Sequence, residues 1–325
     1  MRAWQLNELG DPWQQMAQLE LDEPQVEAGQ LVIEVDAADI NFADILQCQG
    51  KYQVKLKPPF VPGMGACGTV LTAGAGVDIA VGTRVVGPTV AEHGGFAQQA
   101  VLLAEQSTVV DPRVAAVDAA ALHVTYGTAW FGLHLRGRLR PGETVLVLAA
   151  AGGVGSAAVE LAKIHGCWVI AAASGSKREA CLQLGADEFV DYGADDWYDT
   201  VMALTQGRGV DVVYDPVGGE YFEVARRLVA WEGRLLIIGF ASGEIPKAAL
   251  NHALVKNYDL VGVHMGGYRR YDNSVFDRCY AELYAMAAEG QLHPLIDRVV
   301  GDDGLLQALR DLYERRSAGR LIYQP

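Results

Sequence analysis

The chain has 325 residues and a formal net charge of −14 at pH 7, with 50% hydrophobic and 20% charged residues. This length predicts two domains, and the balance of residue types excludes a disordered or fibrous chain. The negative charge repels phosphate groups and so disfavours broad binding to nucleic acids or anionic membranes. Glu8 and Asp11 interrupt the segment where a signal peptide would be apolar, and no apolar run is long enough for a bilayer. We therefore expect a cytoplasmic protein with neither a membrane nor a nucleic-acid partner.

The cysteines are five in number and show no CxxC spacing: Cys48, Cys67, Cys167, Cys181 and Cys279. An odd, scattered set predicts neither a disulfide framework nor a structural zinc site. We expect reduced and mostly buried thiols.

The first 110 residues contain short β-type runs separated by glycine and proline, which favours a small barrel or sandwich. One interruption, INFADILQCQGKY, has helix start signals at Asp39 and Asn41 and continues into a loop that ends at Lys51 and Tyr52. Functional residues are frequent in such loops.

From about Ala119 to Val263, apolar strands alternate with helical segments, which predicts βαβ units and a doubly wound parallel sheet. After Val263 we predict one long helix, residues 276–289, and a final strand, RLIYQP. The simplest division is a barrel-type domain of residues 1–119 completed by 264–325, with a Rossmann domain at 120–263 between them.

The segment TVLVLAAAGGVGSAAVELAK passes from an apolar strand through a glycine-rich turn into a helix. This is the position of a dinucleotide-binding turn, with Ala150 in place of its first glycine. Gly152 allows the backbone to approach a pyrophosphate, and Gly155 allows the helix to pack close to the strand. We expect Ala150, Gly152, Gly153 and Val154 to bind a dinucleotide. The alternative is a structural βαβ turn.

The second strand of this unit ends without the acid that usually contacts the ribose of NAD, because no Asp or Glu occurs from Leu161 to Arg178. Ser174 and Lys177 instead offer hydroxyl and cationic donors for a 2′-phosphate. The sequence therefore predicts NADPH as the cofactor. The alternative is that Lys177 and Arg178 are ordinary surface cations.

Taken together, these segments resemble the zinc-free quinone oxidoreductase branch of the medium-chain dehydrogenase/reductase superfamily, which includes NADPH:quinone reductases and zeta-crystallin. The resemblance covers nearly the whole chain. It is carried by INFADILQCQGKYQ, FVPGMGACGTV, RPGETVLVLAAAGGVGSAAVELAK, LGADEFVDY, DVVYDPVGG, GRLLIIGFASGEIP and ERRSAGRLIY, in the family's order.

The resemblance implies a fold with a GroES-like β-barrel-type catalytic domain plus a doubly wound Rossmann domain. It also implies a homodimer that pairs sheet edges around YDLVGV. It places Asn41 near the nicotinamide, and Ser174, Lys177 and Tyr192 at the 2′-phosphoribose. The remaining implied cofactor contacts are Gly152 to Val154, Phe240, Ser242 and Arg316.

Two positions depart from the family pattern. Ala149 stands where many relatives have glycine, which alters the turn slightly. Gly65 stands where many have an acid, which removes a side chain that often supports the cleft.

The zinc positions of related alcohol dehydrogenases hold Asn41 and Met64, and neither an amide nor a thioether is a good zinc ligand beside hard oxygen chemistry. We therefore predict no metal.

Without a Lewis acid the acceptor has to be electrophilic by itself, such as a quinone or an enone. The expected activity is NADPH-dependent hydride transfer to a quinone, with Asn41, Tyr52 and Thr125 as candidate catalytic residues. Two alternatives stay open: an NADPH-dependent enone or acryloyl-CoA-type double-bond reductase, and a non-catalytic, crystallin-like NADPH-binding protein.

Overall fold

The computed structural model describes residues 1–325 and divides into two compact units. Unit 1 contains Met1–Val124 and Tyr280–Pro325, and unit 2 contains Thr125–Cys279. The divisions fall inside helices α3 (Ala116–Trp130) and α9 (Ser274–Ala288). The domain boundaries expected after residues 119 and 263 stay predictions.

Unit 1 is built on a sheet in the order β14-β15-β3-β4-β5-β7, with β6 also paired to β3. Nearly all neighbouring strands are antiparallel. Leu31, Ile33 and Phe96 belong to its buried apolar core. The strands are β3 (Gln30–Ile40), β4 (Gly65–Ala73), β5 (Arg84–Pro88), β6 (Gln99–Leu103), β7 (Thr108–Val109), β14 (Ile296–Val300) and β15 (Arg320–Tyr323), and β1 (Arg2–Leu6) and β2 (Met16–Glu20) form a separate pair.

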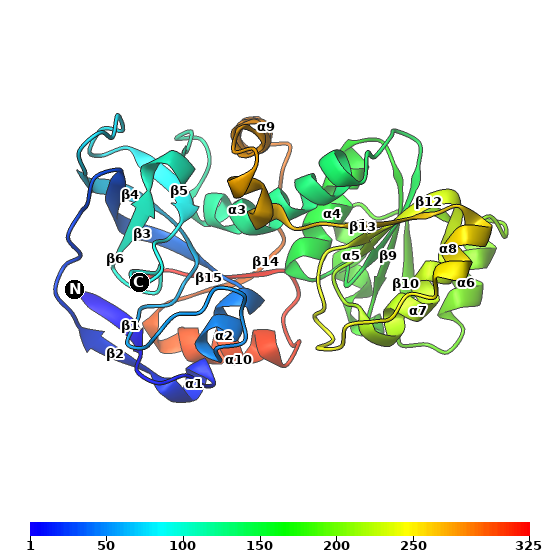
Figure 1. Ribbon diagram of the computed structural model, residues 1–325, viewed down its shortest axis with the longest axis horizontal. Helices are drawn as coiled ribbons and strands as arrows, with labels where there is room; N and C mark the ends of the chain where they lie inside the picture. Colours follow the sequence, from blue (N-terminus) through cyan, green and yellow to red (C-terminus); the bar gives the residue numbers. More distant parts are fainter. The chain divides into compact units, whose positions relative to one another are not determined.

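The end of the chain returns to this sheet, where β15 lies antiparallel to β3 (Figure 1). Leu321 is opposite Ile40, and Tyr323 is opposite Ala38. The final strand predicted from RLIYQP is therefore present. Two neighbouring elements were missed: β14, whose residues are mostly exposed, and the nine-residue helix α10 (Leu305–Tyr313).

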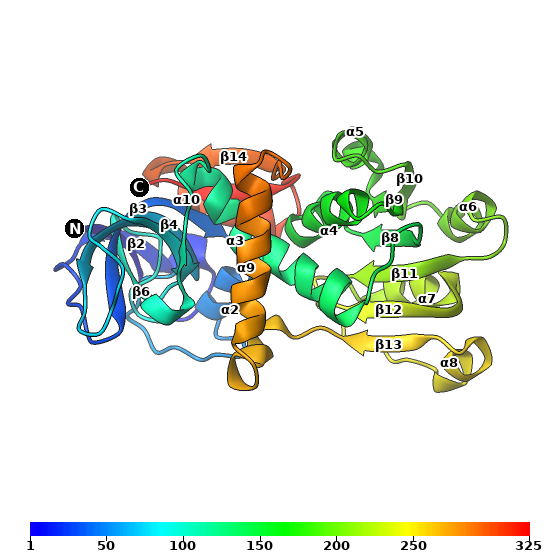
Figure 2. The same cartoon turned by 90° about the horizontal axis from the view of Figure 1, so that it is seen from above.

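Unit 2 is built on six parallel strands in the order β10-β9-β8-β11-β12-β13 (Figure 2). This confirms the doubly wound sheet. The strands are apolar because helices cover both faces of such a sheet. They are β8 (Thr144–Leu148), β9 (Trp168–Ala173), β10 (Glu188–Asp191), β11 (Val210–Asp215), β12 (Val229–Ile237) and β13 (Asp259–Gly262), and the helices are α4 (Gly153–Ile164), α5 (Arg178–Gln183), α6 (Trp197–Leu204), α7 (Gly219–Leu228) and α8 (Leu250–Lys256).

The strand order of unit 2 reverses between β8 and β11. From β8 the chain builds outward to β9 and β10, and it then crosses back to add β11, β12 and β13 on the other side. In open α/β sheets, ligands bind beside the carboxyl ends of the strands at such a reversal. The loops that follow β8, β9, β10, β11 and β12 all lie at this one edge.

All five cysteines are buried, as expected, and no two of them are paired. None of the helices is long and apolar enough to cross a membrane.

Candidate functional site

The turn after β8 has the form expected of a phosphate cradle. Ala149 adopts a left-handed backbone conformation with φ of 49°, which costs an alanine about 1 kcal/mol relative to glycine. The N–H of Gly152 donates to the carbonyl of Ala149 over 2.7 Å and closes the turn. Helix α4 begins at the next residue, with Gly152 as its N-cap.

Gly155 brings α4 very close to this turn. A Cβ atom at Gly155 would lie 2.1 Å from the carbonyl oxygen of Ala149, so no side chain fits there. A Cβ atom at Gly152 would lie 3.1 Å from the same oxygen, which is tight but less severe. The N–H groups in the first turn of a helix have no acceptor within the helix. The bare glycines therefore leave room for an anion in front of the amides of Gly153 and Val154.

The predicted 2′-phosphate residues come together at the ends of β9 and β10. Asp191 pairs with Ala173 in the parallel register, and the N–H of Tyr192 donates to the carbonyl of Ala173 over 3.3 Å. Ser174 follows β9 directly, and its carbonyl accepts the N–H of Lys177 over 2.9 Å. Ser174 and Lys177 thus follow the strand next to β8, and Tyr192 is one strand further out, because β9 lies between β8 and β10.

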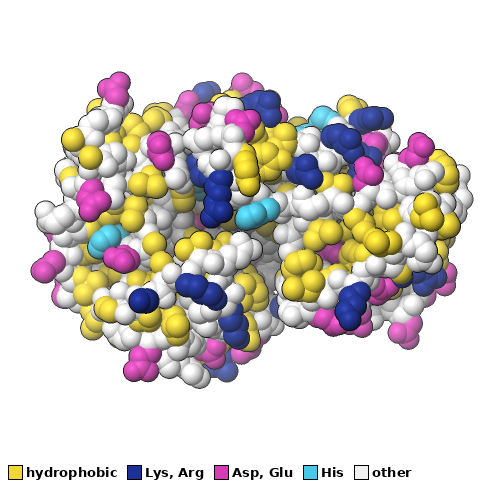
Figure 3. All heavy atoms as spheres, viewed as in Figure 1, with side chains coloured by type: hydrophobic (Ala, Val, Ile, Leu, Met, Phe, Trp, Pro, Cys, Tyr) yellow, Lys and Arg dark blue, Asp and Glu magenta, His cyan; other side chains and the backbone are white.

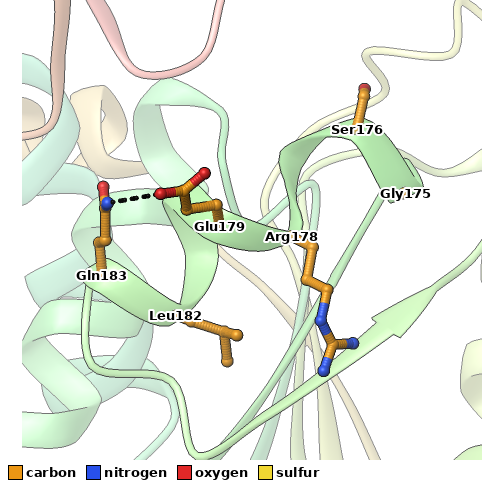
Figure 4. Close-up of a pocket in the computed structure, with 6 residues that line it drawn as sticks. All are labelled: Gly175, Ser176, Arg178, Glu179, Leu182 and Gln183. Atoms are coloured by element: carbon orange, nitrogen blue, oxygen red, sulfur yellow. Dashed lines mark hydrogen bonds between the residues drawn. The ribbon is translucent and has the colours of Figure 1, made fainter.

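Arg178 belongs to a different environment from Lys177. A shallow surface hollow is lined by Gly175, Ser176, Arg178, Glu179, Leu182 and Gln183, and Arg178 and Ser176 point in opposite directions (Figure 4). The guanidinium of Arg178 lies 5.4 Å from the ring centre of Phe189, which is a cation–π distance. Arg178 therefore packs on Phe189 of β10, at the surface of the sheet.

An acid also lies beside this loop. The carboxylate of Asp191 accepts the N–H of Gly193 over 2.9 Å, and its other oxygen lies 2.5 Å from the place of a Cβ atom on Gly175. Asp191 ends the strand beyond the one on which the acid of an NAD site usually lies, so the expected pattern does not include it. It was detectable from the motif EFVDY, whose acid ends the third strand of the unit.

The loop after β12 is held against the loop after β11. The N–H groups of Ala241 and Ser242 donate to the carbonyls of Pro216 and Val217, each over 3.0 Å. Phe240 is 40% exposed, and its ring lies 2.9 Å from the place of a Cβ atom on Gly218. The predicted contacts Phe240 and Ser242 therefore lie at the carboxyl edge of the sheet, together with the phosphate turn.

Asp215 fixes the loop after β11, although no sequence motif predicts a role for it. Its carboxylate accepts the N–H groups of Val217 and Gly218 over 2.8 and 2.9 Å. Burial raises the pKa of Asp215, and these two hydrogen bonds oppose that rise. The residue is 2% exposed and serves to hold the backbone of the loop.

In unit 1, Asn41 is the N-cap of helix α2 (Phe42–Cys48) and belongs to a buried polar cluster. Its amide Nδ2 donates to Asp39 over 2.7 Å, and its Oδ1 accepts from Arg320 over 2.9 Å. Arg320 also donates to Asp39 over 3.1 Å. These three side chains are between 1% and 6% exposed.

Asp44 lies on the other side of Asn41 and holds two backbone groups. It accepts the N–H of Asn41 over 2.7 Å and the N–H of Met64 over 2.8 Å. Burial and then the charge of Asp39 raise the pKa of Asp44 to about 7. Sequence analysis did not select Asp44, although an acid three residues after an N-cap is a known helix-start signal.

Tyr52 lies in the loop after α2, where its N–H donates to the carbonyl of Leu46 over 3.1 Å. Burial raises the pKa of Tyr52, and the charge of Asp44 raises it further. Asn41 and Tyr52 thus stand at opposite ends of α2, and the charge of Asp44 acts on the phenol of Tyr52. A phenol with a raised pKa stays protonated and can donate a hydrogen bond.

Two other predicted residues have local roles of their own. Arg316 donates to Asp311 over 2.7 Å and forms a second ion pair with Glu314, so a cofactor phosphate would compete with these acids. Thr125 is buried in α3. The hydroxyl of its neighbour Tyr126 donates to Glu160 of α4, so this buried tyrosine has a partner within unit 2.

The polar cluster does not suit a zinc ion. The Oδ1 atom of Asn41 already accepts from Arg320, whose positive charge would oppose a cation at the same place. Met64 offers only a thioether, and no group of three or more His, Cys, Asp or Glu side chains is arranged to hold a metal. No catalytic step through zinc is therefore derived.

Comparison with known proteins gives matches along the whole chain. Residues 153–280 match the family described as zinc-binding dehydrogenase, and residues 27–128 match the alcohol dehydrogenase GroES-like domain. The chain is 36% identical to a quinone oxidoreductase-like protein 2 homolog of Nematostella vectensis, over 99% of this chain and 88% of that protein.

Two solved structures have the same fold. A probable oxidoreductase from Mycobacterium abscessus has a TM-score of 0.90 and 33% identity, over 100% of this chain and 99% of that one. A mycobacterial protein in complex with NADPH has a TM-score of 0.90 and 30% identity, over 100% of both chains. These matches confirm the predicted fold class, a GroES-like β-barrel-type domain plus a Rossmann domain.

Gly152→Val is expected to abolish dinucleotide binding and leave the fold intact. The backbone of Gly152 is extended, with φ of −86° and ψ of 173°, which suits a branched residue, and the new side chain fills the space for a pyrophosphate. We expect NADPH and NADH each to bind at least about 100-fold more weakly by calorimetry. Gly155→Ala is the comparison variant, because its clash with the Ala149 carbonyl should lower the free energy of unfolding by about 1–3 kcal/mol and also displace the amides at the start of α4. Unchanged affinity in Gly152→Val would mean that the pyrophosphate lies elsewhere.

Asp44 is expected to make the stability depend on pH. Its pKa is about 7 in the folded chain against an ordinary value of 3.8, so the folded state binds the extra proton between these values. The stability gained from this proton is complete below pH 3.8 and is lost as the pH rises through about 7. The free energy of unfolding falls by up to about 1.4 kcal/mol per pH unit in this range. Urea denaturation from pH 5 to 8 should show this fall in the wild type and a flatter profile in Asp44→Asn. Parallel profiles would contradict the assignment.

Proposed function

Because the chain belongs to the quinone oxidoreductase branch of the medium-chain dehydrogenase/reductase superfamily, we propose that it transfers hydride from NADPH to a quinone without a metal. The observation that supports this most directly is the turn after β8. Its glycines leave the amides of Gly153 and Val154 open to an anion, as a dinucleotide site requires.

The loops at the carboxyl edge of unit 2 would hold the cofactor. Ala150 and residues 152–154 would bind the pyrophosphate, and Phe240 and Ser242 would lie toward the nicotinamide. When bound, NADPH supplies a hydride from C4 of its nicotinamide ring. The protein's part is to hold that ring and to exclude water, so that the acceptor is reduced in preference to side reactions.

Selection of NADPH over NADH would come from Lys177, Ser174 and Tyr192. Lys177 can donate a charged hydrogen bond to a 2′-phosphate. Asp191 acts in the opposite direction, because its carboxylate lies against the same loop and would repel a phosphate. We infer that the balance favours NADPH, since Lys177 brings a full positive charge and Asp191 already accepts the N–H of Gly193.

Reduction of the acceptor requires a hydride and a proton. The polar residues of unit 1 would surround the acceptor oxygen. Asn41 and the protonated hydroxyl of Tyr52 are donors to the oxygen that gains negative charge. Thr125 is a third candidate donor. A quinone suits such a site because it accepts hydride without a Lewis acid.

We also propose a homodimer that pairs two copies along β13. This strand has β12 on one side only, so its other edge offers unpaired N–H and C=O groups. The adjacent helix α8 exposes Leu250 and Leu254 by 73% and 75%, and hydrophobic side chains reach the surface of this unit (Figure 3). A second copy would cover this apolar surface.

Oxidation of NADPH with a panel of acceptors tests the proposed activity. The panel contains 1,4-benzoquinone, 9,10-phenanthrenequinone and small enones, and we expect turnover of the quinones with no added metal. Turnover of enones alone would favour a double-bond reductase, and NADPH binding without any turnover would favour a binding protein. A requirement for added zinc would overturn the metal-free mechanism.

Lys177→Ala is expected to weaken NADPH much more than NADH. Loss of one charged hydrogen bond should cost about 1.5–3 kcal/mol, or roughly 10- to 150-fold in Kd. Arg178→Ala is the matched control, since Arg178 packs on Phe189 and should change the two affinities little. Titration of each cofactor by calorimetry measures both variants. Equal weakening of NADPH and NADH by Lys177→Ala would refute the phosphate contact.

A further inference from the structure

Asp39 is a buried acid that has no role in the proposed activity so far. It lies near the end of β3 and is 1% exposed. Its Oδ2 accepts from Asn41 over 2.7 Å and from Arg320 over 3.1 Å. Its Oδ1 is buried and has no hydrogen-bond partner. A carboxylate held in this way needs a specific reason, because burial of a charge is costly.

Gly65 on β4 makes room for this carboxylate. A Cβ atom on Gly65 would lie 2.6 Å from Oδ1 of Asp39, and the three heavy atoms nearest to it all belong to the Asp39 side chain. The backbone of Gly65 is not in the left-handed region, so its conformation does not demand glycine. The absent side chain at residue 65 is therefore explained by Asp39 alone.

Arg320 and Asp39 together fix the orientation of the Asn41 amide. A guanidinium can only donate, so the atom of Asn41 that faces Arg320 has to be Oδ1. The atom that faces Asp39 is then Nδ2. One Nδ2 hydrogen is committed to Asp39, and the second is the polar hydrogen that the amide has left to offer.

We propose that Asp39 is a positioning residue, which occupies the place of a side chain at Gly65 and orients the Asn41 amide toward the reacting groups. This rests on the proposed function, in which Asn41 contacts the nicotinamide side of the cofactor. Asp39 touches neither cofactor nor acceptor and acts through Asn41. Asp39 thus fills, from the neighbouring strand, the space that a side chain at residue 65 would take.

Three variants separate orientation of the amide from simple neutralisation of Arg320. Asp39→Ala removes the acceptor of Asn41. Asp39→Asn keeps an oxygen for Asn41 and Arg320 but removes the charge. Asp39→Ala/Gly65→Glu returns a carboxylate from the other strand, since Oδ2 of Asp39 lies 3.7 Å from the place of the Gly65 Cβ atom and a glutamate reaches about that far.

Steady-state kinetics with NADPH and 1,4-benzoquinone measure the effect. We expect Asp39→Ala to lower kcat by roughly 10- to 100-fold, because a misplaced donor spoils the reacting geometry, while KM for NADPH changes by less than about threefold. Asp39→Asn and the double variant should each recover kcat to within about threefold of the wild type. A normal kcat in Asp39→Ala, or an Asp39→Asn as slow as Asp39→Ala, would overturn the proposal.

The side-chain amide resonances of Asn41 provide a readout that needs no turnover. They are assigned as the pair of ¹⁵N–¹H signals missing from Asn41→Ala. In the wild type we expect two well-separated signals that exchange slowly with solvent, since Nδ2 is buried and bound. The separation should collapse in Asp39→Ala and return in the double variant. If Asp39→Ala does not fold, a folded double variant with wild-type signals supports the proposal, and one with collapsed signals overturns it.

The two readouts also separate this proposal from the proposed activity. Absence of quinone turnover in the wild type, with the Asn41 signals responding as described, would mean that the amide is oriented for another reaction. Normal quinone turnover in every variant would leave the oxidoreductase intact and remove the role of Asp39.

Discussion

The close approach of helix α4 to the turn after β8 is the constraint on which the candidate cofactor site depends. Only a hydrogen atom fits at Gly155, because a Cβ atom would lie 2.1 Å from the carbonyl oxygen of Ala149. This contact sets the first turn of α4, and with it the amides of Gly153 and Val154, at the carboxyl edge of the sheet. The strand order then brings the loops after β9, β10, β11 and β12 to the same edge. One short contact thus sets the place of these amides, and the strand order sets which loops surround them.

Much of unit 2 was predictable because its signals are local. The strand, the glycine turn and α4 follow one another within about 20 residues. Continuous apolar residues in a strand indicate that both of its faces are buried. Once the strands are known, parallel pairing makes Ser174, Lys177 and Tyr192 neighbours without any knowledge of side-chain contacts. The same reasoning applied to the third strand would have found Asp191. It was missed because the acid was sought only on the strand that directly follows the phosphate turn.

The cluster around Asn41 could not be predicted in this way. Asp39 and Arg320 are 281 residues apart, and they meet only because β15 returns to pair with β3. The sequence indicated a final strand but not its neighbours β14 and α10, since β14 has few buried residues and α10 is short. Gly65 was recognised as a departure from the family pattern. Its reason, a carboxylate from another strand in the place of its side chain, is a tertiary contact that no local pattern records.

The turn after β8 and the cluster around Asn41 therefore differ in the groups that they use. The phosphate turn uses backbone amides, which almost any sequence can supply if glycine stands where a Cβ atom would intrude. Such a site tolerates substitution elsewhere and leaves a recognisable motif. The cluster of Asp39, Asn41, Asp44 and Arg320 uses buried side chains that satisfy one another's hydrogen bonds, so a replacement that cannot keep these bonds leaves its partners unsatisfied. A carboxylate at residue 39 accordingly requires glycine at residue 65. The turn after β8 can thus be predicted from single positions, whereas the cluster around Asn41 can be recognised only from pairs of residues.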